Sequence, residues 1–324
     1  MEKIFEKINS IIKEYDSIIL MGHKDPDLDS LGSCLGLYEI VESFNKKAYL
    51  FINYSHLEDY NTNINQAFIK MQKNVVCVNE KSYKNIPGKK LVIVVDVHSK
   101  DRLEYSTILD EYDSIVLDHH IKNKNYIKNA KFFYIDSTLS SMCEMITYYV
   151  NYLNIKIDDV IASILLAGIE IDTNGYNLKT TERTYQAASI LIKLGADTIL
   201  KQELLKETKE DYIKRATFIR NSFMITDSIA MCIISGITSS LELAQTAEEL
   251  LNFEDVEASF VLGKIDNNLI SVSGRSLGKI DVSKVINKLG GGGHSSNAAA
   301  QIRNKNLKEV QKKIIEVIGE FWRE

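Results

Sequence analysis

Short apolar runs alternate with polar loops and helical patterns along the first part of the chain. The runs that predict strands are residues 17–21, 48–52, 75–78, 91–95 and 114–117. The last two are continuously apolar, which is typical of strands buried on both faces of a parallel sheet. Helical periodicity at residues 1–16 and 31–44 adds helices before and after the first strand. This order predicts an α/β domain with a mainly parallel sheet flanked by helices.

Helical periodicity then dominates from Ser140 to about Ile219, and we expect Gly168, Gly175 and Gly195 to interrupt it. Beyond this stretch, strands are predicted at residues 229–234, 258–262 and 269–273, with helices at 241–251 and 282–289. This second alternation indicates a smaller α/β domain. A length of 324 residues also favours two domains. We place the first at residues 1–205, a charged helical linker at 206–222 and the second at 223–324.

Composition narrows the class of protein. Hydrophobic residues make up 45% and charged residues 26% of the chain, which excludes a long disordered tract. A net charge of -5 argues against a surface for long duplex nucleic acid but leaves a short nucleotide open. The cysteines are not paired as CxxC and are expected to be reduced core residues: Cys34, Cys77, Cys143 and Cys232. With neither a signal peptide nor a membrane span, the chain as written is expected in the cytoplasm.

Five of the six histidines fall beside Asp, Gly or a predicted strand end. HKDPDLDS, VVDVH and LDHH each follow an apolar strand, where ligands collect in open α/β sheets. GIEIDTNGY follows a helical run. The residues offered to one pocket are His23, Asp27, Asp29, Asp96, His119 and Asp172.

This donor set favours a borderline-hard divalent cation over a thiolate-bound zinc. Several clustered Asp side chains cannot all stay ionised without cations, and two ions sharing a carboxylate suit displacement at phosphorus. Taken alone, Asp29 or Ser30 could merely cap the following helix, and Asp25 is interpreted as a solvated loop carboxylate. The occurrence of all four Asp- or His-bearing motifs in one domain favours a metal site over separate structural roles.

A glycine run in the second domain suits a phosphate. Gly290, Gly291, Gly292 and Gly293 can bring backbone N–H groups close to an anion, and His294 and Arg275 add charge or hydrogen bonds. The alternative is a flexible turn between a helix and a strand. We therefore expect the metals in the first domain, much of the substrate contact in the second, and the active site in the cleft between them.

In their order, these motifs resemble the DHH/DHHA1 phosphoesterase family, named after the triplet at Asp118, His119 and His120. GRSLG and GGGGHSSNAA correspond to the DHHA1 signature, so the resemblance spans nearly the whole chain. It implies two divalent cations, most simply Mn²⁺, with Mg²⁺ or Co²⁺ as alternatives.

The resemblance also implies a role for each residue. His23 and Asp27 would bind one ion, Asp29 and Asp172 the other, and Asp96 would bridge them while His119 completes the set. Of the catalytic candidates, His120 would face the phosphate, and Asp118 would orient the neighbouring imidazoles.

Within the family, the chain looks most like the catalytic module of GdpP-type cyclic-di-AMP phosphodiesterases, and His98 favours this branch. Such proteins carry N-terminal membrane helices, a PAS domain and a degenerate GGDEF domain, so this chain would be a cytosolic module of a longer membrane-anchored protein or a short form. Val97 and Met142 depart from the usual family residues without removing a ligand.

The leading hypothesis is hydrolysis of cyclic di-AMP to 5′-pApA. One alternative is an NrnA-like nanoRNase that degrades short oligoribonucleotides, with phosphatase activity on 3′-phosphoadenosine 5′-phosphate. A second alternative is a nucleotide sensor that binds but does not hydrolyse its ligand. The complete set of metal-ligand residues argues against this alternative. A homodimer is a further partner hypothesis.

Overall fold

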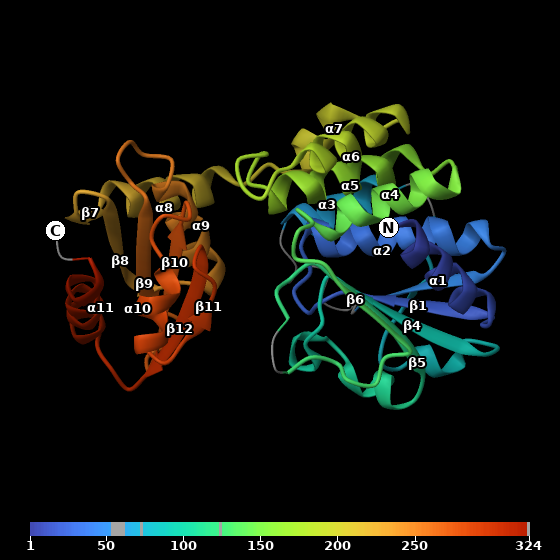
Figure 1. Cartoon of the computed structure of the whole chain (residues 1–324), viewed down its shortest axis with the longest axis horizontal. Coiled ribbons are helices and arrows are strands. Elements are labelled where there is room, and N and C mark those ends of the chain that lie inside the picture. Colours follow the sequence, from blue (N-terminus) through green and yellow to red (C-terminus); the bar gives the residue numbers. More distant parts are fainter. Residues whose placement is uncertain (53–61, 72–73, 123–124, 323–324) are drawn as a thin grey trace. The chain divides into compact units, whose positions relative to one another are not determined.

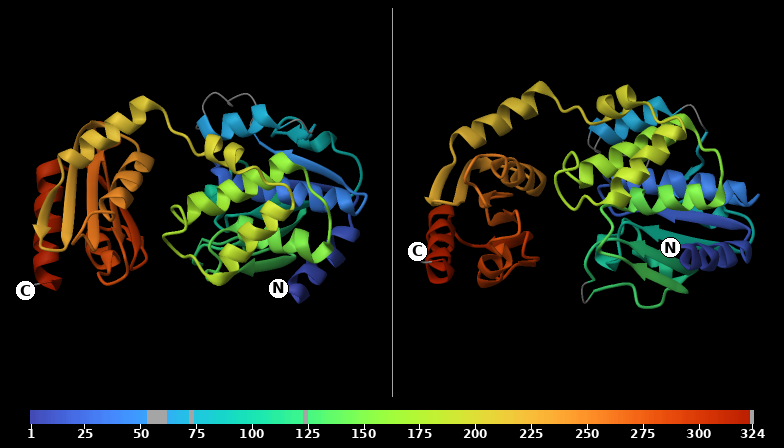
Figure 2. Two further views of the ribbon diagram at one scale, coloured as in Figure 1. Left: turned by 90° about the horizontal axis from the view of Figure 1, so that it is seen from above. Right: turned by 45° about the horizontal axis from the view of Figure 1, so that its top comes forward.

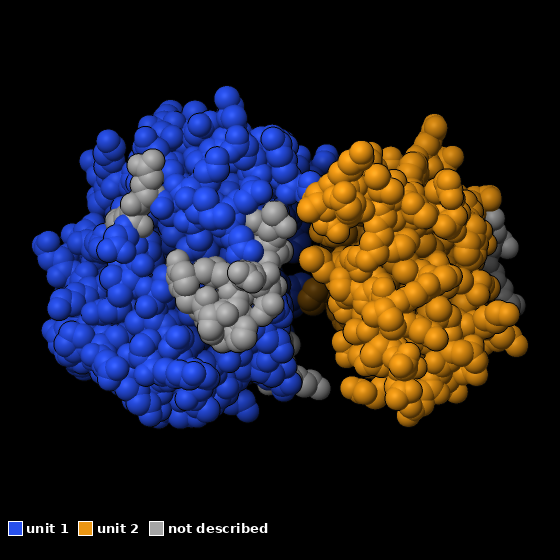
Figure 3. All heavy atoms as spheres, turned by 180° about the vertical axis from the view of Figure 1, so that it is seen from behind, with its two compact units in different colours: residues 1–207 blue, residues 208–324 orange. Residues whose placement is uncertain are grey.

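In the computed structural model, residues 1–52, 62–71, 74–122 and 125–322 are described. The chain divides into two units, residues 1–207 and 208–324 (Figure 3). Among the described residues, no helix has both the length and the apolar character that crossing a membrane requires.

A six-stranded, wholly parallel sheet forms the centre of the first unit (Figure 1). Its strands are β1 (Ser17–Met21), β2 (Lys47–Phe51), β3 (Cys77–Val78), β4 (Lys90–Val95), β5 (Asp113–Asp118) and β6 (Phe132–Ile135). They lie in the order β3-β2-β1-β4-β5-β6. The five strands predicted from the sequence are therefore confirmed, while β6 was not predicted.

Both faces of this sheet are buried, which explains the continuous apolar runs. In β4, for example, Ile93 packs into a large helical core and Val94 into a smaller core on the opposite face. The helices packed around the larger core include α1 (Glu2–Lys13), α2 (Leu28–Ser43), α4 (Met142–Leu153) and α5 (Asp159–Asp172). The opposite face is covered partly by the short 3-10 helices η2 (Tyr83–Asn85) and η4 (Ser106–Asp110).

Helix α2 lies at the centre of the helical layer and is buried on nearly all sides. It contacts β1, α4 and α5, as the views in Figures 1 and 2 show. The remaining helices of this unit are α3 (Thr62–Lys70), α6 (Glu182–Lys193) and α7 (Thr198–Leu204).

Two of the three expected glycine interruptions are confirmed. Gly175 and Gly195 have φ values of 66° and 102°, which glycine adopts without steric cost, and both follow helices. The prediction for Gly168 was wrong, because this residue lies inside α5. A Cβ atom there would stand 2.5 Å from Sγ of Cys143 and 2.8 Å from the carbonyl oxygen of Leu28. Gly168 therefore permits close packing of α5 against α2 and α4 rather than a break.

The second unit contains a mixed six-stranded sheet in the order β11-β12-β10-β9-β8-β7. Its strands are β7 (Phe223–Thr226), β8 (Ile229–Ile237), β9 (Ala258–Lys264), β10 (Leu269–Ser276), β11 (Gly292–Gly293) and β12 (Asn297–Arg303). Only β8 and β9 pair in parallel; the other neighbours are antiparallel.

Helices cover both faces of this second sheet. Residues of α10 (Val282–Lys288) and α11 (Leu307–Phe321) share one core with Met231, while α9 (Ser240–Leu250) shares another with Cys232. The expected connector contains α8 (Lys209–Arg220), whose Phe218 and Ile219 pack on the α9 side. Helix α8, which was expected in the linker, is thus part of the second unit.

Candidate metal centre

The predicted ligands of the first unit gather at the carboxyl ends of its central strands. His23 follows β1, Asp96 follows β4, and His119 follows β5. Asp29 lies in the first turn of α2, and Asp172 is the last residue of α5, inside the helix rather than after it. The structure thus brings together side chains from four separate stretches, as expected for ligands of an open parallel sheet.

Asp96 lies between the two histidines. Its Oδ2 is 3.4 Å from Nε2 of His23, and its Oδ1 is 3.2 Å from Nε2 of His119. The residue is 2% exposed and has a φ of 63°, an unusual backbone conformation for a non-glycine residue. One carboxylate therefore presents an oxygen to each half of the cluster.

Each half contains further donors. On one side, Nε2 of His23 is 3.7 Å from Oδ2 of Asp27. On the other, Nε2 of His119 is 3.2 Å from Oδ2 of Asp172 and 3.6 Å from Oδ2 of Asp29. Within each set of three, His23 with Asp27 and Asp96 or Asp29 with His119 and Asp172, the ligand atoms lie within 4.8 Å of one another.

The backbone fixes two of these carboxylates. Oδ1 of Asp27 accepts a hydrogen bond of 2.9 Å from the amide of Ser30, so Asp27, not Asp29 or Ser30, caps α2. Asp29 accepts hydrogen bonds from the amides of Met142 and Cys143, at 2.8 and 2.6 Å. These amides begin α4, where the helix dipole favours a negative charge.

Asp118 binds two imidazoles. Its Oδ1 accepts hydrogen bonds from Nδ1 and from the amide of His120, at 2.8 and 3.1 Å, and its Oδ2 contacts Nδ1 of His98. Burial raises the pKa of this carboxyl, but the hydrogen bonds from His120 and His98 hold the pKa of Asp118 below its usual range. Asp118 is fully buried, which fits the expected orienting role.

The carboxylates of the cluster lie so close together in a buried region that they cannot all stay ionised without a compensating positive charge. Burial raises the pKa of Asp29, and the charges of Asp172 and Asp96 raise it further. Burial likewise raises the pKa of Asp172 above its usual value. Burial lowers the pKa of His23, but Asp27 and Asp96 beside it outweigh this and raise the pKa of His23 to about 11. These shifts all favour the uptake of positive charge by the cluster, which a cation could supply.

A divalent cation fits these donors. Oδ1 of Asp96 and both ring nitrogens of His119 are buried and have no hydrogen-bond partner among the described residues. Buried polar atoms normally have a partner, so such atoms facing one another indicate a missing ligand. Carboxylate oxygens with a minority of imidazoles are also the donor chemistry of a borderline-hard divalent cation. The cluster can therefore hold metal.

In the second unit, Arg275 is already engaged. It lies in β10, and its Nε donates to Oε1 of Glu248 at 3.0 Å. Its Nη1 donates to Oγ of Ser273 and to the carbonyl oxygen of Gly274. A phosphate at this residue would have to share or replace the contact with Glu248.

The glycine run is partly ordered by hydrogen bonding. The amides of Gly290 and Gly291 donate to the carbonyl oxygens of Asn287 and Ile286, closing α10. Gly292 and Gly293 form β11, paired with β12 at the edge of the sheet. A Cβ at Gly291 would stand 2.3 Å from the carbonyl oxygen of Ala299. The close approach of these two backbone segments therefore requires glycine at this position, whether or not a ligand binds. His294 follows it and is exposed.

The remaining sequence interpretations can also be located. Asp25 is exposed and belongs to none of the candidate ligand groups found in the described part of the chain. Val97 and Met142 are buried in the two cores of the first unit. The four cysteines are free, and only Cys77 is not fully buried.

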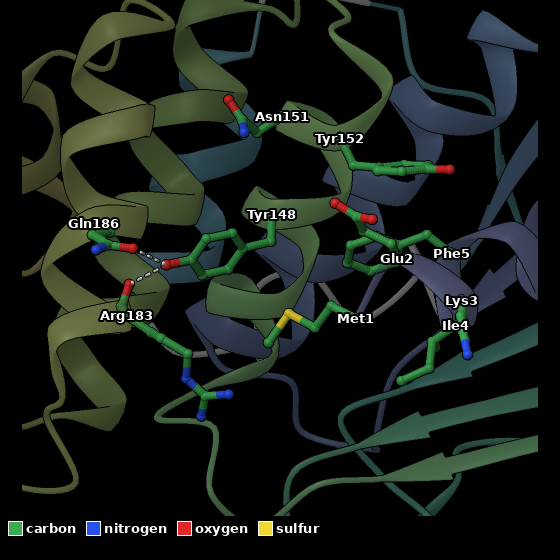
Figure 4. A pocket seen from close by; sticks show the side chains of 10 residues that line it. All are labelled: Met1, Glu2, Lys3, Ile4, Phe5, Tyr148, Asn151, Tyr152, Arg183 and Gln186. Atoms are coloured by element: carbon green, nitrogen blue, oxygen red, sulfur yellow. Dashed lines mark hydrogen bonds between the residues drawn. The ribbon is translucent and has the colours of Figure 1, made fainter.

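A hollow of about 810 Å³ in the first unit contains none of the predicted site residues (Figure 4). It lies between the start of α1, α4 and α6, where the hydroxyl of Tyr148 donates to Gln186 and to the carbonyl oxygen of Arg183. Its lining combines aromatic and amide side chains with Glu2, Lys3 and Arg183, and none of these residues belongs to a candidate metal-ligand group of the described chain.

The contact between His98 and Asp118 is the feature that the sequence reasoning missed. From the sequence, His98 serves only to favour one branch of the family, although an imidazole two residues after a strand-end Asp can reach the neighbouring strand end. The hydrogen bonds from α4 to Asp29 carry no comparable sequence signal, because the partners are more than 110 residues apart.

Comparison with known proteins finds relatives along nearly the whole chain. It is 34% identical over 330 residues to the cyclic-di-AMP phosphodiesterase PdeA of Listeria monocytogenes, covering 99% of this chain and 50% of that protein. The chain thus spans about half the length of this relative. It is also 29% identical over 314 residues to the bifunctional oligoribonuclease and PAP phosphatase NrnA of Mycoplasma genitalium, covering 93% of each.

The fold has a solved counterpart. An exopolyphosphatase-related protein from Bacteroides fragilis matches with a TM-score of 0.81 and 16% identity, covering 99% of this chain and 97% of that one. Residues 17–169 match the DHH family N-terminal domain, and residues 226–320 match the DHHA1 domain. Five of the six proposed ligands lie in the first of these regions, and Asp172 lies three residues beyond its end. The chain belongs to the DHH/DHHA1 family.

Proposed function

We propose that this chain is a metal-dependent phosphodiesterase that hydrolyses cyclic di-AMP to 5′-pApA. The observation that carries the proposal is Asp96, which directs one oxygen toward His23 and the other toward His119. A carboxylate so placed can join two cation sites. The 34% identity to PdeA, named for action on cyclic di-AMP, supports the choice of substrate.

Each half of the cluster would hold one divalent cation. His23 and Asp27 would bind the first, Asp29, His119 and Asp172 the second, and Asp96 both. The donor set favours Mn²⁺, with Mg²⁺ or Co²⁺ as alternatives. When bound, the two cations would lower the pKa of a water nucleophile and offset charge at the phosphate.

The chain's own residues would position the reaction. Water adds to phosphorus while the bond to one 3′ oxygen breaks, which leaves a 3′ hydroxyl and a 5′ phosphate. His120 is anchored through Nδ1 and its side chain is 39% exposed. In the protonated ring, Nε2 also carries a proton and can donate a hydrogen bond to a phosphate oxygen. Asp118 would hold this orientation and thereby reduce the cost of ordering the imidazole during the reaction.

The second unit would contribute substrate contacts. We assign Arg275, His294 and the glycine run at residues 290–293 to the second phosphate. Arg275 supplies a planar donor array suited to phosphate, and the exposed edge formed by Gly292 and Gly293 lets an anion approach backbone closely.

An oligoribonuclease is the second candidate. The relative NrnA, named as an oligoribonuclease and PAP phosphatase, matches over 93% of its own length, unlike PdeA. The same cluster would serve either reaction, since both break a phosphoester bond. Rates on cyclic di-AMP and pApA distinguish them.

A nucleotide panel tests the reaction class. The metal-stripped chain is assayed on cyclic di-AMP, pApA, short oligoribonucleotides and 3′-phosphoadenosine 5′-phosphate, with Mn²⁺, Mg²⁺ or Co²⁺, and products are resolved by chromatography. We expect cyclic di-AMP to give pApA only when a divalent cation is added. Metal-independent turnover, or no turnover of any phosphoester, contradicts the proposal. Light scattering on the same sample tests the homodimer hypothesis.

A further inference from the structure

A buried imidazole beside the proposed catalytic pair has no role in the account so far. His98 is 3% exposed and lies two residues after Asp96. It belongs to none of the candidate ligand groups of the described residues. Its Nδ1 instead contacts Oδ2 of Asp118, whose other oxygen accepts from His120.

We propose that His98 is a positioning residue that fixes, through Asp118, the direction in which His120 faces the substrate. The inference rests on the proposed function, because it assigns His98 to the same site. It does not make His98 a metal ligand or a group that touches the substrate.

The argument begins with the two oxygens of Asp118. An ionised carboxylate only accepts hydrogen bonds, so both imidazoles donate to it through Nδ1. The terminal torsion of Asp has a broad, roughly two-fold preference and does not by itself hold the carboxylate plane. Donors on both oxygens, His98 on one and His120 on the other, do hold it. Removing His98 would leave a buried oxygen without this donor, and the carboxylate would turn to recover one.

The consequence reaches His120. With its Nδ1 donating to Asp118, a neutral His120 keeps its lone pair on Nε2, and a protonated one carries a second N–H there. In both forms Nε2 is the ring atom left for substrate, and the side chain is 39% exposed. If Asp118 turns, Nδ1 loses its fixed acceptor, and oxygen Oδ1 of Asp96, 3.6 Å away, becomes the competing one. His120 would then point differently relative to the phosphate.

Two substitutions separate positioning from packing. His98→Leu keeps an apolar body of similar size but removes the donor. His98→Asn keeps an amide N–H near the place of Nδ1. We expect His98→Leu to lower kcat roughly 10- to 100-fold, the usual effect of losing a partner of this kind, with KM and metal content unchanged. His98→Asn should restore the greater part of kcat.

A double-mutant cycle tests the path of the effect. If His98 acts through His120, then adding His98→Leu to His120→Ala should lower kcat no further. Multiplicative losses in the double mutant, loss of metal in His98→Leu, or a rise of KM in place of a fall in kcat would each overturn the inference.

Imidazole NMR gives a readout independent of turnover. The chain has six histidines, so long-range proton–nitrogen correlations of ¹⁵N-histidine-labelled, metal-free protein can be assigned by single substitutions. We expect His120 in the unsubstituted chain to carry its proton on Nδ1, and His98→Leu to shift it toward a tautomer mixture. An unchanged His120 pattern in His98→Leu contradicts the inference. An inactive unsubstituted chain would contradict the proposed function, and this spectrum would still decide the role of His98.

Discussion

Oδ1 of Asp96 lies 3.2 Å from Nε2 of His119, and neither atom has a hydrogen-bond partner in the described part of the chain. Two buried polar atoms that face each other without bonding are costly unless a third group joins them. Because Oδ2 of Asp96 turns toward His23, the same carboxylate can serve two cations.

Replacing Asp96 with Ala should reduce kcat on cyclic di-AMP by more than roughly a hundredfold. The carboxylate shared by both proposed ions would vanish, and loss of a two-metal arrangement should raise the barrier by several kcal/mol. Steady-state rates and metal analysis check this. Asp25→Asn is the matched control, since Asp25 is an exposed carboxylate of the first motif outside the cluster. Activity of Asp96→Ala above about a tenth of the unsubstituted rate would refute the shared carboxylate.

Metal affinity should rise with pH. A histidine binds metal only when neutral, yet Asp27 and Asp96 raise the pKa of His23 to about 11 in the metal-free chain. His23 therefore keeps its proton below that pH, and metal must displace it. Each released proton makes affinity rise up to about tenfold per pH unit.

Calorimetric titration of Mn²⁺ measures this release when it is repeated in buffers of different ionisation enthalpy. The observed heat should depend on the buffer, in the direction of proton release. A buffer-independent heat, together with an affinity that does not change between about pH 6 and 8, would contradict the assignment of His23 as a ligand.

The sequence predicts the strands of the first sheet well, because a strand buried on both faces requires a continuous apolar run, as in β4 and β5. It also predicts that the proposed ligands lie together, since His23, Asp96 and His119 stand at strand ends that a parallel sheet brings to one edge. Contacts that helices make with the site are harder to predict from the sequence. The amides that hold Asp29 depend on where α4 begins, and only the packing of α4 against α2 determines that.

Two sequence predictions failed because small residues were misread: a glycine inside a helix and alanines inside a strand. Gly168 was predicted to break a helix, but it lies inside α5. Glycine is required there because the neighbouring helices leave no room for a Cβ atom. The strand β12 has the sequence NAAAQIR, in which Ala298 and Ala300 are buried in the core that the sheet shares with α10 and α11. Small alanines lack the bulky alternation by which a strand is recognised, so tertiary pairing with β10 decides its structure.

Gly168→Ala should destabilise the chain by roughly 1–3 kcal/mol, because the new Cβ would stand 2.5 Å from Sγ of Cys143 and 3.0 Å from Cα of Asp29. Chemical unfolding followed by circular dichroism measures the free energy of unfolding. Gly319→Ala is the control: this glycine lies in α11 with no atom within 4 Å of a built Cβ, so alanine should stabilise by about 0.4–1 kcal/mol. Equal effects of the two substitutions would show that helix packing does not require Gly168.

Arg275→Gln should raise KM for cyclic di-AMP while leaving metal content unchanged, because the residue belongs to the second unit and every proposed ligand belongs to the first. Glu248→Gln separates binding from structure, since it weakens the same ion pair but keeps the guanidinium. We expect KM to rise in Arg275→Gln and not in Glu248→Gln. If both substitutions raise KM equally, Arg275 acts through the ion pair and not on the phosphate.

The most direct test compares two substrates on the unsubstituted chain. Initial rates are measured side by side for cyclic di-AMP and for pApA, with Mn²⁺ saturating and products resolved by chromatography. The proposed function predicts a larger kcat/KM for opening the cyclic dinucleotide, with pApA accumulating as product. Faster cleavage of pApA to AMP, with little turnover of cyclic di-AMP, would contradict it.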